Sequence, residues 1–174
     1  IMHKEITNAE ELRAVQAPLK QLYRDKPEAA LVPARAEGIL ETNDIACMVR
    51  SWHGEVTAGL HKAGGGSGEL ACSADMLLEA MVACAGVTLR AVATAMGVTI
   101  RSGKIVAEGV WDARGTLAID RATPVGLTEI ALKFDIDCDA DAAKLERMIQ
   151  STERYCVILQ TLKTPPKLSV SIGG

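Results

Sequence analysis

The spacing of hydrophobic residues changes several times along the chain, and each change predicts a new element. Apolar residues at steps of three and four after a Thr7–Glu10 capping box predict an N-terminal helix that ends before Pro27. Short alternating stretches across 34–60 predict two or three antiparallel strands. The apolar run over 73–96, with Ser at its start and Gly97 after its end, predicts a long, buried central helix.

In the second half of the chain, hydrophobic and polar residues first alternate and then follow helical spacing. The alternation predicts two long strands, over Val98–Trp111 and Val125–Asp137. Asp139–Ser151 and Thr152–Leu162 predict two helical segments, and Leu168–Ile172 predicts a short closing strand. The fold class is therefore α+β, in the order strands, central helix, strands, helices, last strand.

Composition narrows the class of protein. A length of 174 residues suits a single domain, and 48% hydrophobic with 24% charged residues is ordinary for a soluble globular chain. A net charge of −3 argues against a nucleic-acid partner. No uninterrupted apolar run approaches the roughly 18 residues of a membrane span, so no membrane partner is expected. Glu5, Glu10 and Glu11 interrupt any signal-peptide core, which predicts a cytoplasmic location.

The cysteines are the main candidates for chemistry. Five of them, an odd count without a secretion signal, argue against a structural disulfide framework. There is no C-x-x-C, and the three histidines are scattered, so neither a metal site nor a bound cofactor is predicted. From the residues alone, Cys84 and Cys156 are most simply small core residues, because burial raises a thiol pKa.

His61 and Cys72 flank a glycine-rich loop at 64–68. The loop has neither a dinucleotide-binding nor a Walker pattern, so it is not predicted to bind phosphate. The two residues could belong to the rim of a site or could simply be loop-edge residues. The second interpretation is the more frequent one for isolated signals.

Two cysteine-bearing segments carry a resemblance to a known family. Leu77–Cys84, followed by Thr88–Arg90, resembles the cysteine-bearing central helix of the OsmC/Ohr family, the osmotically induced and organic hydroperoxide resistance proteins. Glu153–Val157 resembles the family's second cysteine motif, and the similarity extends over roughly 34–172. It implies curved antiparallel sheets around long central helices in an intertwined homodimer. Residues 1–33 would then be a helical extension of one OsmC-like domain at 34–174.

The resemblance also implies a reaction. Position by position, Cys84 matches the peroxidatic cysteine and Cys156 the resolving cysteine of these thiol peroxidases. The Cys84 thiolate would reduce a small apolar hydroperoxide and become a sulfenic acid, which Cys156 would convert to a disulfide. An external dithiol, of the lipoyl type or another thiol, would reduce the pair in a role in oxidative-stress defence.

The groups that would activate Cys84 depart from the family pattern. The family's glutamate, ten positions before the peroxidatic cysteine, is replaced by Ala74. Asp75 is the nearest acid, although nine positions of helix turn it away from Cys84. For the cation that stabilises the thiolate we prefer Arg50, at the end of a predicted strand, with Arg35 as the alternative.

Two other functions stay open. The chain could be a redox-regulated dimer that binds a small acyl or aromatic molecule near Cys84 without peroxidase activity. It could also be a dimer without chemistry, in which the cysteines serve only as packed core residues. The redox state and mutual distance of Cys84 and Cys156 distinguish these alternatives.

Overall fold

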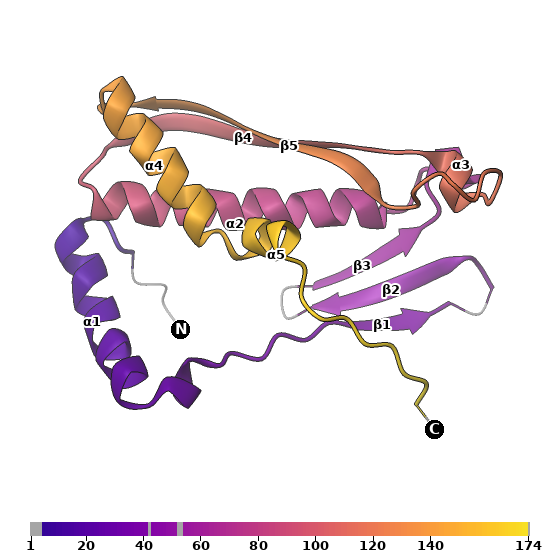
Figure 1. The fold of residues 1–174 in the computed structure, drawn as a ribbon, viewed down its shortest axis with the longest axis horizontal. Helices are drawn as coiled ribbons and strands as arrows, with labels where there is room; N and C mark the ends of the chain where they lie inside the picture. The colour runs from indigo at the N-terminus through magenta and orange to yellow at the C-terminus, as the bar shows by residue number, and fades with distance from the viewer. Residues whose placement is uncertain (1–4, 42, 52–53, 174) are drawn as a thin grey trace. The chain divides into compact units, whose positions relative to one another are not determined.

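The protein is described by a computed structural model that covers residues 5–41, 43–51 and 54–173. Figure 1 shows the elements along the chain. The chain divides into two compact units, each built from separate segments. The first unit comprises Ile1–Gln16, Ala80–Ile105 and Phe134–Gly174, and the second comprises Ala17–Glu79 and Val106–Lys133. The elements in chain order are α1 (Ala9–Asp25), η1 (Pro27–Ala30), β1 (Glu37–Leu40), β2 (Ala46–Ser51), β3 (Gly54–Gly59), η2 (Lys62–Gly64), α2 (Ser73–Ala95), β4 (Ile100–Trp111), α3 (Ala113–Thr116), β5 (Leu127–Cys138), α4 (Ala142–Tyr155) and α5 (Val157–Lys163).

The N-terminal helix α1 begins one residue later than the capping box predicts. The side-chain oxygen of Asn8 accepts a hydrogen bond of 3.0 Å from the Glu11 amide, while the Thr7 amide donates to the Glu11 carboxylate at 2.8 Å. Asn8 therefore occupies the cap position and Glu11 the third helical position, and the Glu11 carboxylate accepts from Thr7, one residue before the cap. The helix ends at Asp25, before Pro27, as predicted.

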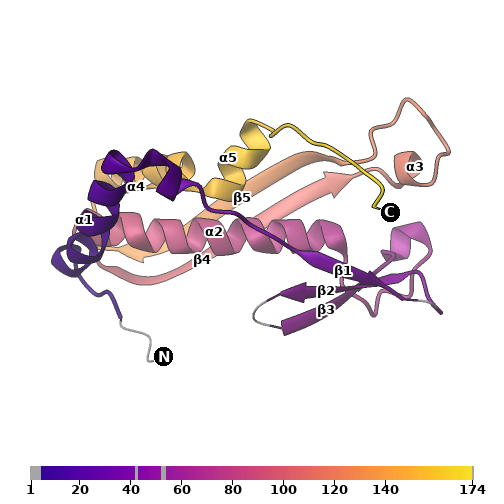
Figure 2. The same cartoon turned by 90° about the horizontal axis from the view of Figure 1, so that it is seen from below.

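The second unit contains a three-stranded sheet, where the sequence predicts two or three antiparallel strands. Its order is β1-β2-β3 with antiparallel neighbours, which Figure 2 shows from below. In the register, Arg50 on the central strand lies opposite Glu37 on one side and Glu55 on the other. A parallel bridge between Ala58 and Ala71 connects β3 to the segment that leads into α2.

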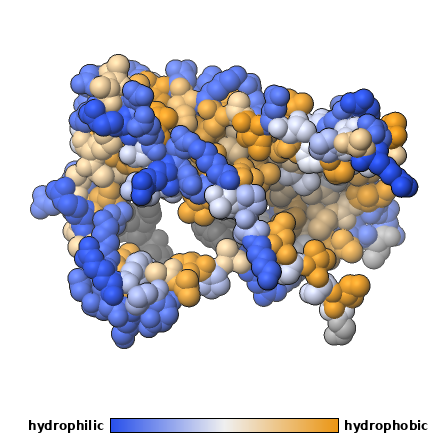
Figure 3. Space-filling model, viewed as in Figure 1, coloured by the Kyte–Doolittle hydropathy of each residue, from blue (hydrophilic) through white to orange (hydrophobic). Residues whose placement is uncertain are grey.

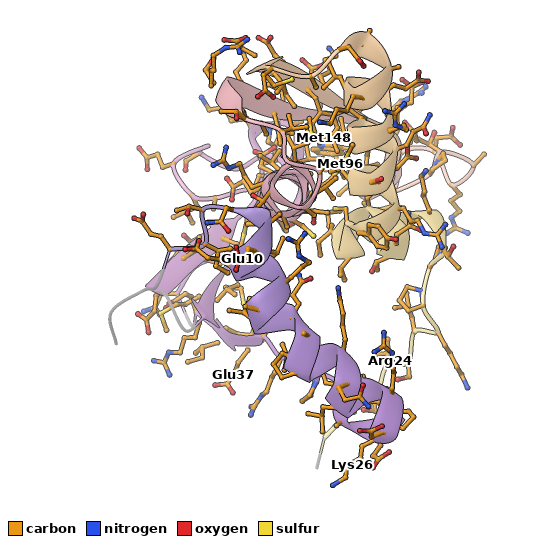
Figure 4. The ribbon with its side chains drawn as sticks, turned by 90° about the vertical axis from the view of Figure 1, so that its left-hand side faces the viewer. Glu10, Arg24, Lys26, Glu37, Met96 and Met148 are labelled. Atoms are coloured by element: carbon orange, nitrogen blue, oxygen red, sulfur yellow. The ribbon has the colours of Figure 1, made fainter. Side chains whose placement is uncertain are left out.

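The core of the first unit lies between α2 and α4. Leu89, Ala93, Val98 and Met148 are buried there, and Met96 packs against them, as the labelled methionines of Figure 4 illustrate. The helix α2 ends as predicted before Gly97, whose φ of +62° is in the left-handed region. Glycine adopts this conformation without the steric cost that a side chain adds.

The two long strands β4 and β5 pair in a two-stranded sheet. In the first unit, Arg101 of β4 forms an ion pair with Asp137 of β5. In the second unit, the Thr128 hydroxyl of β5 donates to the Val110 carbonyl of β4 at 3.1 Å. Partner numbers rise on one strand while they fall on the other, so the pair is antiparallel. Both strands agree with the predicted segments to within two residues.

The C-terminal part of the chain differs from the prediction in two ways. The helix α4 continues to Tyr155, so the helical break is at Cys156 and not near Ser151. The predicted closing strand is absent from the described residues 164–173, where Val170 and Ile172 are each 99% exposed. The alternation of this segment suits a strand, but the described chain supplies no neighbouring strand with which it pairs.

The central helix α2 is less covered than its composition predicts. Only Met81, Ala85, Leu89 and Ala93 are buried, and Val87 is 75% exposed. By length and composition alone, α2 is the one helix in the described chain that could cross a membrane, a test that core helices of soluble proteins also pass. Apolar side chains, orange in Figure 3, also reach the surface elsewhere among charged ones. A single chain therefore leaves apolar surface of α2 without cover.

Candidate functional site

Cys84 and Cys156 lie together in the first unit. Cys84 is in the middle of α2, and Cys156 is the single non-helical residue between α4 and α5. The two thiols are within hydrogen-bonding reach of each other. The fold therefore brings together two cysteines that are far apart in the sequence.

The backbone at Cys156 explains how the second cysteine is presented. Its φ of −73° and ψ of 108° are extended, so the helix stops there and a new one begins. The Cys156 amide still donates to the Thr152 carbonyl at 2.9 Å, and its carbonyl accepts from the Gln160 amide at 2.9 Å. The amides of the first residues of α5 have no acceptor within their own helix. They are therefore available to a sulfur atom.

The surroundings of Cys84 favour its thiolate form. Burial raises the pKa of this thiol, but hydrogen bonds from the Ile158 amide, the Cys156 thiol, the Val157 amide and the Thr88 hydroxyl together outweigh it, so the pKa lies below its ordinary value. Thr88 is one helical turn after Cys84 on α2. The donors stabilise the charged form of the sulfur without an adjacent histidine.

The surroundings of Cys156 have the opposite effect. Burial and the interaction with the Cys84 sulfur raise the pKa of Cys156, although the amides of Leu159 and Ile158 lower it in part. Cys156 is fully buried, whereas Cys84 is partly accessible. The pair is therefore asymmetric: the partly accessible Cys84 has a lowered pKa, and the buried Cys156 beside it has a raised pKa.

The remaining predicted site residues lie in the second unit. Arg50 forms an ion pair with Glu55 at 2.9 Å, and Arg35 forms one with Glu37 at 2.6 Å. Asp75 is in the first turn of α2, on the side of the helix opposite Cys84. These positions leave the predicted roles of Arg50, Arg35 and Asp75 in activating Cys84 as predictions.

Sequence reasoning missed the donors that the site uses. The Val157 and Ile158 amides are invisible to a search for charged or nucleophilic side chains, because they belong to the backbone. A signal was nevertheless present in Thr88, which lies at the helical spacing of four from Cys84. Among the residues that the structure describes, no cluster of three or more His, Cys, Asp or Glu could hold a metal ion.

Comparison with known families identifies the class of protein. A family described as "OsmC-like protein" matches residues 66–171, which include both cysteines and α2, β4, β5, α4 and α5. Because the match covers more than half of the chain, this protein belongs to the OsmC-like family, as the resemblance predicted. A search of the curated proteins found no match.

Solved structures agree at the level of the fold. An OsmC-like protein from Mycoplasma pneumoniae is 17% identical with a TM-score of 0.65, and the alignment covers 77% of this chain and 89% of that one. An organic hydroperoxide resistance protein from Elizabethkingia anophelis is 17% identical, with a TM-score of 0.61 and coverages of 78% and 91%. The organic hydroperoxide resistance protein OhrB of Bacillus subtilis is 14% identical, with a TM-score of 0.54 and coverages of 77% and 93%.

Proposed function

We propose that this protein reduces organic hydroperoxides with Cys84 and Cys156. The observation that carries the proposal is the lowered pKa of Cys84 beside a buried second thiol whose pKa is raised. A lowered pKa increases the fraction of Cys84 that is present as the nucleophilic thiolate, and the Cys156 thiol lies within reach for the following step. The family includes organic hydroperoxide resistance proteins, which supports the same substrate class.

The reaction balances over two steps and a reset. The Cys84 thiolate attacks the distal oxygen of the hydroperoxide, an S–O bond forms, the O–O bond breaks, and the alkoxide that leaves takes up a proton to become an alcohol. Cys156 then attacks the sulfenic sulfur, which forms the disulfide and releases water. An external dithiol reduces the disulfide by thiol exchange and becomes the oxidised product.

The substrate preference follows from the apolar surface near the thiols. Val157 directly follows Cys156 and is mostly exposed. An organic group that covers such surface stabilises binding by about 25 cal/mol per Å² of apolar area. We therefore expect cumene hydroperoxide to be turned over faster than hydrogen peroxide. Equal or faster turnover of hydrogen peroxide contradicts this preference.

The activity test compares cysteine variants under one assay. Wild-type protein with dithiothreitol or dihydrolipoamide should consume cumene hydroperoxide, and Cys84→Ser should abolish this consumption. Cys156→Ser should leave a sulfenic acid on Cys84 that a dimedone-type reagent traps. Cys47→Ser, which changes another partly exposed thiol, serves as the control and should keep the wild-type rate. A Cys84→Ser variant that consumes peroxide at the wild-type rate refutes the proposal.

A cation is expected to add to the activation of Cys84, and Arg50 is our first choice. Its partner Glu55 is exposed, as Arg50 is, and such surface ion pairs contribute only about 0–1 kcal/mol. Arg50 can therefore exchange this partner for a thiolate at little cost, and Asp75 can orient it from another copy of the chain. Arg50→Met should slow peroxide reduction while Arg35→Met should not. The reverse result transfers the role to Arg35.

A homodimer completes the proposal. Proteins of this family are typically dimeric. The apolar surface of α2 that the single chain leaves exposed, Val87 above all, suits a second copy. Sedimentation should give a dimer at micromolar concentration, and Val87→Asp should shift it toward monomer because it places a charge in the contact.

The cytoplasm is the location that we propose for this protein. Five free cysteines and the need for a dithiol reductant suit that reducing compartment.

A further inference from the structure

A cavity of about 360 Å³ lies entirely within the second unit. Its wall combines the end of β3 and the η2 turn with the first turns of α2, the end of β4, α3 and the start of β5. The volume corresponds to roughly a dozen water-sized groups, at about 30 Å³ each. Sites for small molecules begin at about this size. The residues that line it belong to the second unit, whereas Cys84 and Cys156 belong to the first.

Two rings form one part of this wall. His61 and Trp111 contact each other edge to face, with ring centroids 5.4 Å apart and an interplanar angle of 80°. Both line the cavity, together with the aliphatic side chains of Leu77 and Leu127. Edge-to-face geometry is the favoured arrangement of such rings, so the wall is a defined surface.

The hydrogen bonding of His61 fixes what it can offer to a ligand. Its Nδ1 accepts a hydrogen bond of 3.0 Å from the Ala63 amide. In a neutral imidazole the other nitrogen must then carry the proton, so Nε2–H is a donor. Ser73 and Thr116, which each carry a hydroxyl group, also line the cavity, while no acidic residue of the described part of the chain does. The polar part of the wall therefore favours an acceptor on the ligand.

We propose that this cavity binds a small aromatic or branched aliphatic carboxylate. The apolar body would lie against Leu77, Leu127 and the edge of Trp111, and the carboxylate would accept a hydrogen bond from His61 Nε2–H. A carboxylate suits this wall better than a cation, because the lining residues include hydrogen-bond donors and, among the described residues, no acid. The site is additional to the hydroperoxide chemistry and does not depend on it.

Gly126 allows a direct test of the cavity. It lines the cavity, and a Cβ added there meets nothing within 4 Å. Gly126→Phe should therefore fill the cavity with little strain. Gly173→Phe is the matched control, because a Cβ at Gly173 also meets nothing within 4 Å and Gly173 is outside the cavity. The measurement is ligand-observed NMR and calorimetry with benzoate on the full chain.

Benzoate should bind wild type and Gly173→Phe saturably, with the same affinity, and Gly126→Phe should abolish the binding. Cys84→Ser should bind benzoate as wild type does, which separates this site from the proposed peroxide chemistry. Absence of saturable binding to wild type overturns the proposal. So does equal binding by Gly126→Phe.

His61→Phe tests the polar contact separately. Phenylalanine keeps a ring beside Trp111 but removes the donor. A hydrogen bond to a charged group changes affinity by about ten- to a hundred-fold, so the affinity of His61→Phe for benzoate should fall by that factor. Its affinity for nitrobenzene, which has the shape of benzoate without the charge, should fall much less. Equal losses for the two probes contradict the assigned role of His61.

Discussion

Replacement of Thr88 by valine tests how the protein activates Cys84. Valine has nearly the shape of threonine but lacks the hydroxyl that helps to lower the Cys84 pKa. A hydrogen bond to a charged acceptor contributes about 1.5–3 kcal/mol. Thr88 is the smallest of the contributing donors, so the lower end of this range applies. Cys84 is partly accessible, so solvent screens this interaction, and at about 1.4 kcal/mol per factor of ten the thiolate population at neutral pH should fall by at most about tenfold.

The assay is the rate of Cys84 alkylation by iodoacetamide as a function of pH, followed by mass spectrometry of the Cys84 peptide. Thr94→Val is the matched control, because the Thr94 hydroxyl donates to the Arg90 carbonyl at 2.8 Å on the same helix and is not among the groups that shift Cys84. Thr88→Val should slow alkylation below neutral pH and reduce peroxide turnover, while Thr94→Val should do neither. Wild-type behaviour of both variants would refute the reasoning.

Three further predictions concern the fold. Met148→Ala removes a fully buried side chain from the core of the first unit and should lower the free energy of unfolding by about 2–5 kcal/mol in urea denaturation; a loss near zero contradicts the assigned core. The hydrogen bond from Arg114 lowers the pKa of Asp112 from 3.8 to about 2, so this carboxylate stabilises the fold above pH 3.8 and loses its effect as the pH falls through about 2. Asp112→Asn should therefore lower the melting temperature more at pH 6 than at pH 2, and an equal decrease at both values counts against the pair. Gly97→Ala should cost about 1 kcal/mol through the backbone alone, because φ is +62° and the added methyl meets nothing within 4 Å; an unchanged stability rules out the left-handed cap.

Local patterns carried enough information to predict most elements. Some features depend only on residues that are neighbours in the sequence, so the sequence alone shows them. They are the alternation of β4 and β5, the apolar run of α2 and the helix end at Gly97. Cap positions depend on side-chain geometry that the sequence leaves ambiguous, which is why the box at Asn8 was assigned one residue early. The prediction of a closing strand around Val170 was wrong for a different reason. Alternation predicts a strand, but a strand forms only where another strand pairs with it.

The two cysteines of the site could be predicted from the sequence, but the groups that act on them could not. Family resemblance selected Cys84 and Cys156 out of five cysteines, although burial alone favoured two inert thiols. The asymmetry between them could not be predicted, because it arises from the Val157 and Ile158 amides and from the helix break at Cys156. Backbone donors acquire a direction only in the folded chain.

The redox pair itself can be tested by mapping disulfides after oxidation. Reduced protein would be treated with one equivalent of cumene hydroperoxide, alkylated, digested and analysed by mass spectrometry, with Cys138 as an internal reference thiol. The account predicts that the Cys84 and Cys156 peptides are recovered joined by an intramolecular disulfide, while Cys138 is alkylated. Recovery of Cys84 and Cys156 as free thiols after the peroxide has been added would contradict it.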